Sequence, residues 1–259
     1  MMLQETRLHR IRALLSTLSR VSTEQIIKEL GISRETARRD IIELEAQGLA
    51  KRVHGGLVAL DAAPEPPLRV RSTVMAKEKR AIARAAARLL LPGQTVFLDA
   101  GSTTTMLAEE LRTMSGLTVI TNSLNAALKL SAAQEHETLN NQVILLGGCM
   151  QAGAQETRGE LTVGEIFRYR ADVALLSPVG IEQNHGASSF HPYEAAIAGA
   201  MTRQASRLIL LADRSKLGIS SRMNYASIRQ VSTLVTDSNA ATLSAFIALE
   251  QVLPQVILA

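Results

Sequence analysis

Three prolines within four residues, Pro64, Pro66 and Pro67, separate two parts of the sequence that differ in apolar periodicity. Proline fixes its own φ, lacks an N–H donor and disfavours helix at the preceding residue, so a regular element is not expected to run through this stretch. Before it, apolar residues recur every three or four positions, as in helices; after it, short apolar runs alternate with helical patterns. The sequence therefore predicts a small domain at 1–60, a linker at 61–74 and a larger domain at 75–259.

The composition is typical of packed domains. Of the 259 residues, 46% are hydrophobic and 20% are charged, which supplies enough apolar surface for a core. No apolar run approaches the roughly 20 residues that span a bilayer, and the charged start of the chain is unlike a secretory signal. The single cysteine, Cys149, excludes a disulfide framework. We therefore expect a soluble cytoplasmic protein that makes no membrane contact, with Cys149 packed as a small apolar residue and Met106, Met114, Met150 and Met201 in the core.

The positive charge is concentrated in the first third of the chain. Residues 1–80 hold 15 Lys and Arg against 10 Asp and Glu, whereas the remainder holds 13 against 14. A basic module attached to a near-neutral body indicates a polyanion partner, although a few solvated arginines would give the same balance. Aromatic residues make up only 3%, which argues against single-strand readers that stack bases on aromatic rings.

The first domain has the pattern of a winged helix-turn-helix. A first helix is indicated by Leu8, Ile11, Leu14, Leu15 and Leu18, and a second by residues 23–30 with Ser22 or Thr23 as its cap. Gly31–Ser33 breaks the chain before a third helix at 34–47, followed by a hairpin within 49–60. The buried face of the third helix is predicted to be Ala37, Ile41, Ile42 and Leu44.

The opposite face of the third helix suits a DNA major groove. Arginine binds guanine or phosphate, and a helix N-terminus favours a phosphate. The alternative for Arg38 and Arg39 is a solvated face with Glu35 and Glu43 as neighbours at helical spacing. The predicted contacts with double-stranded DNA are Ser22, Thr23, Ser33, Arg34, Glu35, Thr36, Arg38 and Arg39, with Lys51, Arg52, His54 and Gly55 from the wing.

The second domain is predicted to be an α/β sheet with buried parallel strands. Its apolar runs are short and continuous, as in strands covered on both faces. Helices are expected between them. The predicted strands are 95–99, 118–121, 142–146, 172–176, 207–212 and 231–236, and the predicted helices are 77–91, 104–112, 124–130 and 193–204.

Polar residues gather where these strands end. A glycine- and hydroxyl-rich turn between a strand and a helix presents N–H and O–H groups to an anion, and α/β sheets bind ligands at the carboxyl ends of their strands. An ordinary capped turn is the alternative. The predicted anion-site residues are Asp99, Gly101, Ser102, Thr103, Thr104, Thr121, Asn122, Ser123, Gly147, Gly148, Asp213 and Lys216.

The first domain resembles the DeoR family of bacterial transcriptional regulators. The resemblance is most specific in the SxETxRRDxxxLExxG stretch from Ser33 to Gly48 and in the R-x-HGG wing from Arg52 to Gly56, and it covers nearly the whole chain. It implies a repressor of a carbohydrate-metabolism operon whose second domain binds a phosphorylated sugar or a related metabolite. That domain is similar in fold to ribose-5-phosphate isomerase. The implied effector motifs are DAGST, TNS, GG, Glu194 and DRSK. Two-fold operators imply a homodimer or homotetramer.

The chain departs from the family pattern at Ser177–Gly180, where many members carry Ala-Asp-Gly and the isomerase carries catalytic acids, and at Ala198 and Gly199, where a basic residue is common. The missing acid argues against isomerase chemistry. The alternatives are a sugar-phosphate isomerase-like enzyme with an accessory DNA-binding module and a regulator whose sensor domain binds a protein. His185 and His191 near Glu194 have no regular metal-ligand spacing, so no metal is expected. No cofactor and no catalytic residue are expected either.

Overall fold

The computed structural model describes residues 3–18, 20–53, 55–59, 68–132, 141–150 and 155–259. These residues form two compact units, 1–74 and 75–259. After the roles that the sequence predicts for them, we call them the DNA-reading unit and the sensor unit, and each is described by itself.

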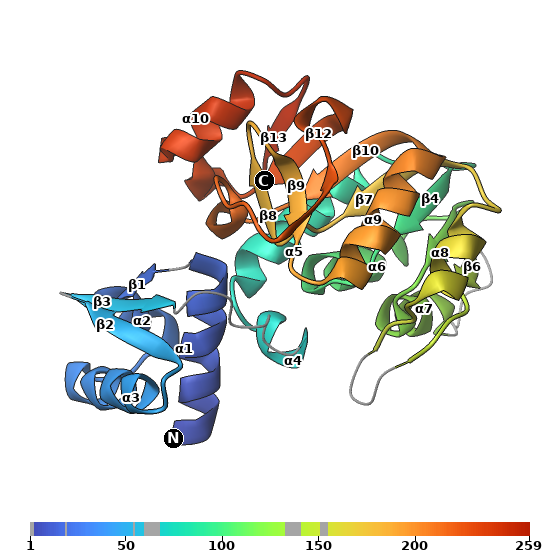
Figure 1. Ribbon diagram of the computed structural model, residues 1–259. Coiled ribbons are helices and arrows are strands. Elements are labelled where there is room, and N and C mark those ends of the chain that lie inside the picture. Colours follow the sequence, from blue (N-terminus) through green and yellow to red (C-terminus); the bar gives the residue numbers. More distant parts are fainter. Residues whose placement is uncertain (1–2, 19, 54, 60–67, 133–140, 151–154) are drawn as a thin grey trace. The chain divides into compact units, whose positions relative to one another are not determined.

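The DNA-reading unit combines helices with a small antiparallel sheet (Figure 1). The helices are α1 (Gln4–Leu18), α2 (Thr23–Leu30), α3 (Arg34–Ala46) and α4 (Leu68–Arg71). The strands are β1 (Arg20–Ser22), β2 (Ala50–Val53) and β3 (Gly56–Ala59), in the order β1-β3-β2. Ile11, Leu14, Val21, Ile26, Leu30, Leu44 and Leu57 fill the core.

The turn between α2 and α3 follows from its local chemistry. Gly31 adopts the left-handed conformation, with φ 63°, which glycine reaches without a Cβ penalty, and its N–H donates to Ile27 O. Ser33 then caps α3 by accepting from the Thr36 N–H at 3.2 Å. The predicted break at Gly31–Ser33 and the third helix are confirmed.

Three details of the DNA-reading unit differ from the prediction. Ile42 is 44% exposed and does not belong to the buried face of α3. Strand β1 was not predicted, because three residues carry too little pattern; it joins the wing through β3. The last part of the expected linker is not irregular, since Leu68–Arg71 forms α4.

The sensor unit contains a seven-stranded parallel sheet with strand order β13-β12-β10-β7-β4-β5-β6 (Figure 1). All of its neighbouring pairs are parallel. The strands are β4 (Thr95–Leu98), β5 (Thr118–Thr121), β6 (Gln142–Leu145), β7 (Ala171–Leu176), β10 (Ala205–Leu211), β12 (Val231–Thr236) and β13 (Val256–Leu258).

Helices cover both faces of this sheet, as the continuous apolar strands require. One core joins α5 (Ala76–Ala87), α6 (Ser102–Leu111) and α7 (Leu124–Ser131) to strand side chains such as Val96 and Leu98. The opposite core joins α8 (Glu160–Ile166), α9 (Pro192–Gln204) and α10 (Ser244–Glu250) to side chains such as Phe97. The predicted α/β class is confirmed.

The strand order places a switch point at β4. The chain passes from β4 outward to β5 and β6, and then returns to the other side of β4 as β7. In sheets of this kind the crevice beyond the carboxyl ends of the two strands at the switch point receives ligands. The ends of β4 and β7 are therefore the first place to look for a site.

A second, antiparallel sheet was not predicted. It consists of β8 (Gly180–Glu182), β9 (Gly186–Ser189) and β11 (Met223–Ala226), in the order β11-β9-β8. Helices α8 and α10 and strand β13 were also missed, because their patterns are short. Short 3-10 helices at Arg214–Lys216, Ile228–Gln230 and Ser238–Thr242 complete the unit.

The predicted burial of two side chains after β6 is wrong. Cys149 is exposed and Met150 is 54% exposed, so neither belongs to the core. Leu145, at the end of β6, is also exposed, since this strand has a neighbour on one side of the sheet only.

Candidate functional site

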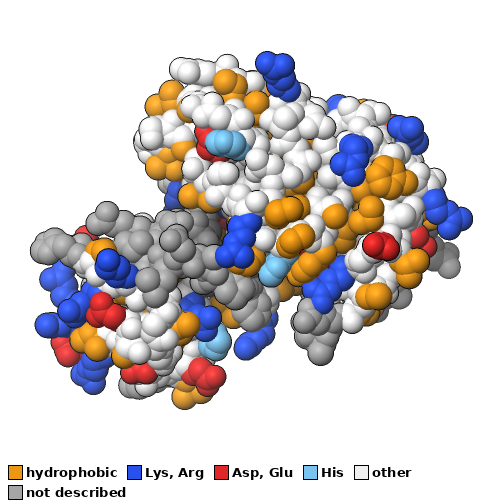
Figure 2. Space-filling view, viewed as in Figure 1, with side chains coloured by type: hydrophobic (Ala, Val, Ile, Leu, Met, Phe, Trp, Pro, Cys, Tyr) orange, Lys and Arg blue, Asp and Glu red, His pale blue; other side chains and the backbone are white. Residues whose placement is uncertain are grey.

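The exposed face of α3 carries the arginines that the sequence assigned to DNA. Arg34, Arg38 and Arg39 are exposed, while Ala37 and Ile41 between them are buried. Alternation of this kind leaves a continuous polar stripe along the helix. In Figure 2, Lys and Arg side chains stand out from the surface of this unit beside acidic ones. The stripe has the shape and charge that a major-groove helix needs.

Two of the three arginines have acidic neighbours. Arg39 Nε lies 3.5 Å from Glu35 Oε1, and Arg34 Nη2 lies 3.6 Å from Glu24 Oε1. All four side chains are more than half exposed, so these pairs are weak and yield readily to a phosphate or a base. The neighbours expected for a solvated face are thus present for Arg39.

The wing is attached to the start of α2. Gly55 O accepts from Thr23 N at 2.8 Å and from Thr23 Oγ1 at 3.2 Å. Ser22 caps α2 in a capping box with Gln25: Ser22 Oγ accepts from Gln25 N at 3.1 Å, and Ser22 N donates to Gln25 Oε1 at 2.9 Å. Ser22, Thr23 and Gly55, which the sequence grouped with the DNA contacts, therefore lie together.

The cations of the wing, Lys51 and Arg52, differ in their contacts. Lys51 is exposed. Arg52 binds Glu45 on α3, with its backbone N–H 3.1 Å from Glu45 Oε1 and its Nε 3.5 Å from Oε2. His54 lies outside the described residues.

A buried ion pair holds α3 in place, and the sequence analysis missed it. Arg7 Nε lies 2.7 Å from Asp40 Oδ2, and a second nitrogen lies 3.0 Å from Oδ1. The hydrogen bond that Arg7 donates to Asp40 is the main reason that the pKa of Arg7 is raised. Asp40 belongs to the stretch that carries the family resemblance, which was the available signal. Its buried position shows that it supports the helix from behind.

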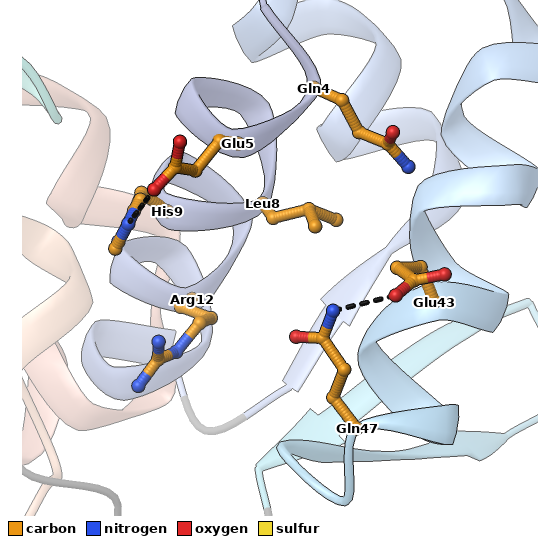
Figure 3. Close-up of a pocket in the computed structure, with 7 residues that line it drawn as sticks. All are labelled: Gln4, Glu5, Leu8, His9, Arg12, Glu43 and Gln47. Carbon is orange, nitrogen blue, oxygen red and sulfur yellow. Dashed lines mark hydrogen bonds and ion pairs between the residues drawn. The ribbon is translucent and has the colours of Figure 1, made fainter.

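A polar pocket lies between α1 and α3 (Figure 3). Its volume is about 450 Å³, and its lining is mixed in charge: Glu5 and Glu43 face it together with His9 and Arg12. Gln47 donates to Glu43 at 2.6 Å across the C-terminal half of α3. The two carboxylates of this pocket repel the negatively charged phosphates of DNA. The Arg34–Arg39 face is therefore the better surface for DNA.

In the sensor unit, Asp99 joins the two strands at the switch point. It follows β4, and its Oδ2 accepts from the N–H of Ser177, which follows β7, at 3.0 Å. Burial, the largest effect, and the nearby charge of Glu194 together raise the pKa of Asp99 to about 7, against the opposing effects of hydrogen bonds from Ser177 and Thr104 and of the charge of Lys216. A pKa raised this far leaves part of this carboxyl protonated near neutral pH.

Helix α6 begins at Ser102, three residues after Asp99. The first N–H groups of a helix have no acceptor within it, and here the first such bond runs from Thr105 N to Gly101 O at 3.0 Å. Ser102, Thr103 and Thr104 are buried, and Thr103 Oγ1 has no hydrogen-bond partner in the described part of the chain. This turn has the donors that an oxyanion needs.

Lys216 adds a buried cation beside the switch point. Its Nζ donates to Pro178 O at 2.7 Å and to Ser177 Oγ at 3.1 Å. Asp213 supports the turn that carries Lys216, because its Oδ1 accepts from Ser215 N at 3.1 Å and from the Ser215 hydroxyl. A buried ammonium held by neutral oxygens is well placed to receive an anion.

Glu194 is a second carboxylate near Asp99, close enough to raise the pKa of Asp99. It lies in the first turn of α9 and accepts from Ser189 Oγ at 2.6 Å. Asp99, the α6 N-terminus, Glu194 and Lys216, all named from the sequence, are thus associated. Tyr225 on β11 was missed: its hydroxyl is buried without a partner among the described residues, and burial and the charge of Asp99 raise its pKa.

The other predicted strand-end residues hold a neighbouring segment. Asn122 Nδ2 donates to Thr157 O at 3.1 Å, and Thr157 Oγ1 donates to Leu146 O at 2.8 Å. Thr121 Oγ1 accepts from the Ser123 N–H, and Ser123 caps α7. These groups position residues 155–158 beside β5 and β6.

The two glycines after β6 have a packing role. Gly147 N donates to Glu165 Oε2 at 2.5 Å, and Gly147 O accepts from Thr162 at 2.7 Å. A Cβ on Gly148 would lie 2.0 Å from Thr162 Oγ1, so only glycine fits there. The Gly147 N–H is therefore occupied by a carboxylate in this structure.

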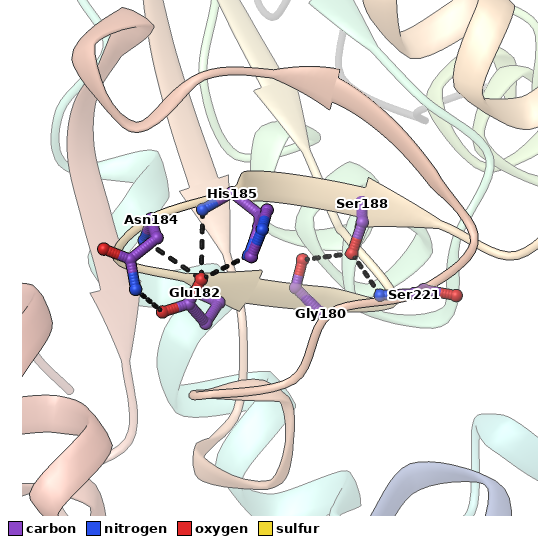
Figure 4. A network of polar contacts seen from close by, with 6 residues as sticks. All are labelled: Gly180, Glu182, Asn184, His185, Ser188 and Ser221. Atoms are coloured by element: carbon purple, nitrogen blue, oxygen red, sulfur yellow. Dashed lines mark hydrogen bonds and ion pairs between the residues drawn. The ribbon is translucent and has the colours of Figure 1, made fainter.

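The β8–β9 hairpin contains His185 (Figure 4), whereas His191 lies directly before α9. Glu182 Oε2 accepts from the N–H groups of Asn184 and His185, each at 3.0 Å, and lies 2.9 Å from His185 Nδ1. These contacts lower the pKa of Glu182 against the effect of its burial. Among the described residues no cluster of His, Cys, Asp and Glu is suited to a metal, and no helix is long and apolar enough to cross a membrane.

Together the winged helix-turn-helix and the α/β unit define a DNA-binding transcriptional regulator with a separate sensor domain. Comparison with known families agrees. Residues 7–63 match the DeoR-like helix-turn-helix domain, and residues 74–238 match the DeoR C terminal sensor domain. The chain belongs to the DeoR family.

Individual relatives cover most of the chain. The HTH-type transcriptional repressor GlcR of Bacillus subtilis (strain 168) is 36% identical over 91% of this chain and 89% of its own length. The glycerol-3-phosphate regulon repressor of Escherichia coli (strain K12) is 31% identical over 84% of each. Ribose 5-phosphate isomerase A of Methanocaldococcus jannaschii matches 55% of this chain and 54% of its own, with 16% identity and a TM-score of 0.39. That last likeness is too distant to bear on function.

Proposed function

We propose that this regulator is a cytoplasmic repressor of carbohydrate-metabolism genes and that a phosphorylated sugar or a related metabolite changes its affinity for DNA. Both relatives above are named as repressors, which supports the direction of regulation, and the name of the glycerol-3-phosphate regulon repressor supports the class of genes. Because half-sites read by such domains are arranged with two-fold symmetry, the active form is a homodimer or homotetramer.

The DNA contacts follow from the exposed stripe of α3. Arg34, Arg38 and Arg39 enter the major groove, Ser33 and Thr36 place the helix N-terminus at a phosphate, and Lys51 and Arg52 bind the backbone from the wing. The acidic partners of Arg34 and Arg39 are exposed and are exchanged for DNA.

The effector site follows from the switch point between β4 and β7. The observation that carries the proposal is the association of a helix N-terminus, a buried lysine and two carboxylates at this point. The phosphate binds the N–H groups of Ser102–Thr104 and Lys216, while Asp99 and Glu194 accept from sugar hydroxyls. With its pKa near 7, Asp99 exists partly as the neutral acid, which lessens repulsion of a dianion.

The test is fluorescence anisotropy on the DNA upstream of the gene that encodes this protein. Binding is measured at two salt concentrations, with and without glycerol 3-phosphate, glucose 6-phosphate, ribose 5-phosphate and inorganic phosphate. We expect tight binding that weakens steeply with salt and is released by one of the sugar phosphates. Binding equal to that on random DNA, or indifference to every phosphate, would contradict the proposal.

A matched pair of variants locates the site. Lys216→Met removes the buried cation and is expected to abolish the response to the sugar phosphate. Lys129→Met is the control, because Lys129 pairs with Glu109 at the surface of α6 and α7 and lies on neither strand of the switch point. An equal response in both variants would exclude the Lys216 site.

An isomerase activity is the second candidate, favoured by one observation. The pKa of Asp99 near 7 suits a general base at neutral pH. Turnover of ribose 5-phosphate that is lost in Asp99→Asn would support the isomerase. A protein that binds the sugar phosphate without converting it would exclude the isomerase and leave the regulator as the proposed function.

A further inference from the structure

The Asp213–Lys216 turn carries two cations that contact different parts of the sensor unit. Lys216 binds Ser177 and Pro178 at the switch point. Arg214, two residues earlier, binds carboxylates on other elements. Arg214–Lys216 is a single 3-10 turn, closed by hydrogen bonds from Lys216 N to Asp213 O and from Leu217 N to Arg214 O, so the two cations are carried by one local backbone structure.

Arg214 is held by two carboxylates. Its N–H donates to Asp237 Oδ2 at 2.7 Å, and its Nη1 lies 2.8 Å from Asp237 Oδ1 and 3.2 Å from Glu78 Oε1. Burial lowers the pKa of Arg214, but the hydrogen bonds and charges of Asp237 and Glu78 outweigh it, so the pKa is raised. The guanidinium thus ties the turn after β10 to the residue that follows β12 and to α5.

Glu78 lies in the first turn of α5, and α5 is the first element of the sensor unit. The chain reaches it from α4 of the DNA-reading unit through residues 72–75 only. Ser72 and Thr73 are hydrogen bonded back to α4, at 2.8 Å to Leu68 O and 2.9 Å to Val70 O. Met75 is the sole non-glycine residue with positive φ in the described part of the chain, at 55°. Residues 72–75 therefore form the covalent path from α4 to α5, and the first two of them are held by local hydrogen bonds.

We propose that Arg214 is a positioning residue that couples the effector site to the DNA-reading unit through Glu78. An anion that draws Lys216 away from Ser177 and Pro178 displaces the turn, and with it Arg214 and the start of α5. Residues 72–75 pass this displacement to α4, which packs on α1. The inference rests on the proposed function, because it requires an effector at Lys216.

The rival explanation is that the Arg214–Glu78 contact is only a structural brace. A brace contributes to the stability of the unit and leaves the response to effector intact. A coupling element changes the response while effector binding itself is preserved, since allostery is a free energy shared between two sites. The two roles are therefore separated by measuring binding of effector and of DNA independently.

The test uses the full-length protein with Glu78→Gln, which removes the negative charge of Glu78 and leaves Arg214 bound to Asp237. Calorimetry without DNA gives the Kd for glycerol 3-phosphate, glucose 6-phosphate and ribose 5-phosphate. Anisotropy gives the operator Kd with and without each compound at saturation. Glu109→Gln is the control, because it breaks the Lys129–Glu109 pair elsewhere on the unit.

For Glu78→Gln we expect an effector Kd within about threefold of the wild type and a loss of at least fivefold in the ratio of operator Kd with and without effector. Glu78→Asp, which keeps the carboxylate, is expected to restore most of the ratio. Arg214→Lys, which keeps the charge but has no planar fork to bridge two carboxylates, is the second variant and is expected to lose it. The control retains the wild-type ratio.

The outcomes separate the two proposals. A wild type that binds none of the three sugar phosphates overturns the proposed function, and the coupling with it. A wild type that responds, with Glu78→Gln and Arg214→Lys responding equally well, overturns the coupling alone. If both variants have a lower Tm but an unchanged ratio of operator Kd with and without effector, the Arg214–Glu78 contact only stabilises the unit, and the coupling is overturned.

Discussion

Arg7 on α1 grips the buried carboxylate of Asp40 on α3, with Nε 2.7 Å from Oδ2. The side chain of Asp40 is only 1% exposed, although its neighbours Arg38 and Arg39 face solvent. Burial of a charged residue in this helix is tolerated because the guanidinium supplies two parallel hydrogen bonds. Together with the buried apolar side chains of α3, the pair orients this helix so that Arg38 and Arg39 face solvent.

Removing Arg7 leaves a buried carboxylate without its cation. We expect Arg7→Met to lower the free energy of unfolding of the DNA-reading unit by about 3–5 kcal/mol, the usual cost of breaking a buried pair. Urea unfolding followed by circular dichroism measures it. Lys28→Met, at an exposed position of α2, is the control and should change stability by less than about 0.5 kcal/mol. A loss of similar size in both variants would show that the pair is not specially important.

Arg38 and Lys51 are expected to act on DNA in different ways. Arg38→Ala should weaken operator binding by about 1–3 kcal/mol and relax preference at one base pair, because the side chain reads a base. Lys51→Ala should weaken binding to all sequences alike and reduce the salt slope by about 0.9, because the side chain binds a phosphate. Anisotropy titrations on operator and random DNA over a salt series distinguish the two. Unchanged operator affinity in Arg38→Ala would remove it from the reading face.

The raised pKa of Asp99 predicts that the sensor unit loses stability as pH rises. In the unfolded chain an aspartate titrates near pH 4, whereas here its pKa is about 7. Between these values the folded state keeps a proton that the unfolded state has released, so the free energy of unfolding falls from about pH 4 to pH 7 and levels off above. Asp99→Asn has no carboxyl to titrate at this position, so its free energy of unfolding lacks this contribution to the pH dependence.

We therefore expect the Tm of Asp99→Asn, relative to that of the wild type, to be higher at pH 8 than at pH 5. Differential scanning fluorimetry across this range suffices, and the other titrating groups cancel in the difference. Parallel Tm curves for the two proteins would mean that Asp99 is ionised in the folded protein throughout.

Tyr225 offers a test of how the effector is recognised. Its hydroxyl is buried and unpaired among the described residues, so Tyr225→Phe should leave the stability of the free protein unchanged or slightly raised. If a sugar hydroxyl pairs with it, affinity for the sugar phosphate should fall about fivefold to tenfold, while affinity for inorganic phosphate stays the same. Calorimetry on the variant gives both values, with Tyr169→Phe as the control. An equal loss for both ligands would place Tyr225 against the phosphate.

Much of the fold could be predicted because its local signals are strong. The strands at Thr118–Thr121 and Val231–Thr236 have the predicted bounds, since each is a short apolar run between polar turns. The third helix of the DNA-reading unit is announced by Ser33 and the glycine before it. What could not be predicted depends on contacts distant in sequence. In the sequence, Asp40 looks like one more solvent-exposed charge on a helix. Its burial depends on Arg7, which is 33 residues away in the sequence and lies beside it in the structure.

In the candidate site, too, the features with a local sequence signal could be predicted and those that depend on distant contacts could not. Asp99 and Lys216 were named because they end strands, and parallel strands end at one edge of the sheet. Their order along that edge, with β7 next to β4, came from the topology. Tyr225 had no pattern to reveal it, because β11 belongs to the small second sheet. Gly148 carried a signal, a glycine after a strand, but its reason is the hydroxyl of Thr162 that occupies the place of a Cβ.

The anchoring of the wing to α2 has a consequence for the choice of operators. Because both donors of Thr23 hold Gly55 O, and because β1 pairs with β3, the wing is attached to the helix pair at two places. We expect a wing attached in this way to adjust little to grooves of different width. A duplex that binds it is then expected to bend or narrow, and the ease of that deformation depends on base steps that the protein does not touch. We therefore expect part of the operator sequence to be selected for flexibility rather than for contact.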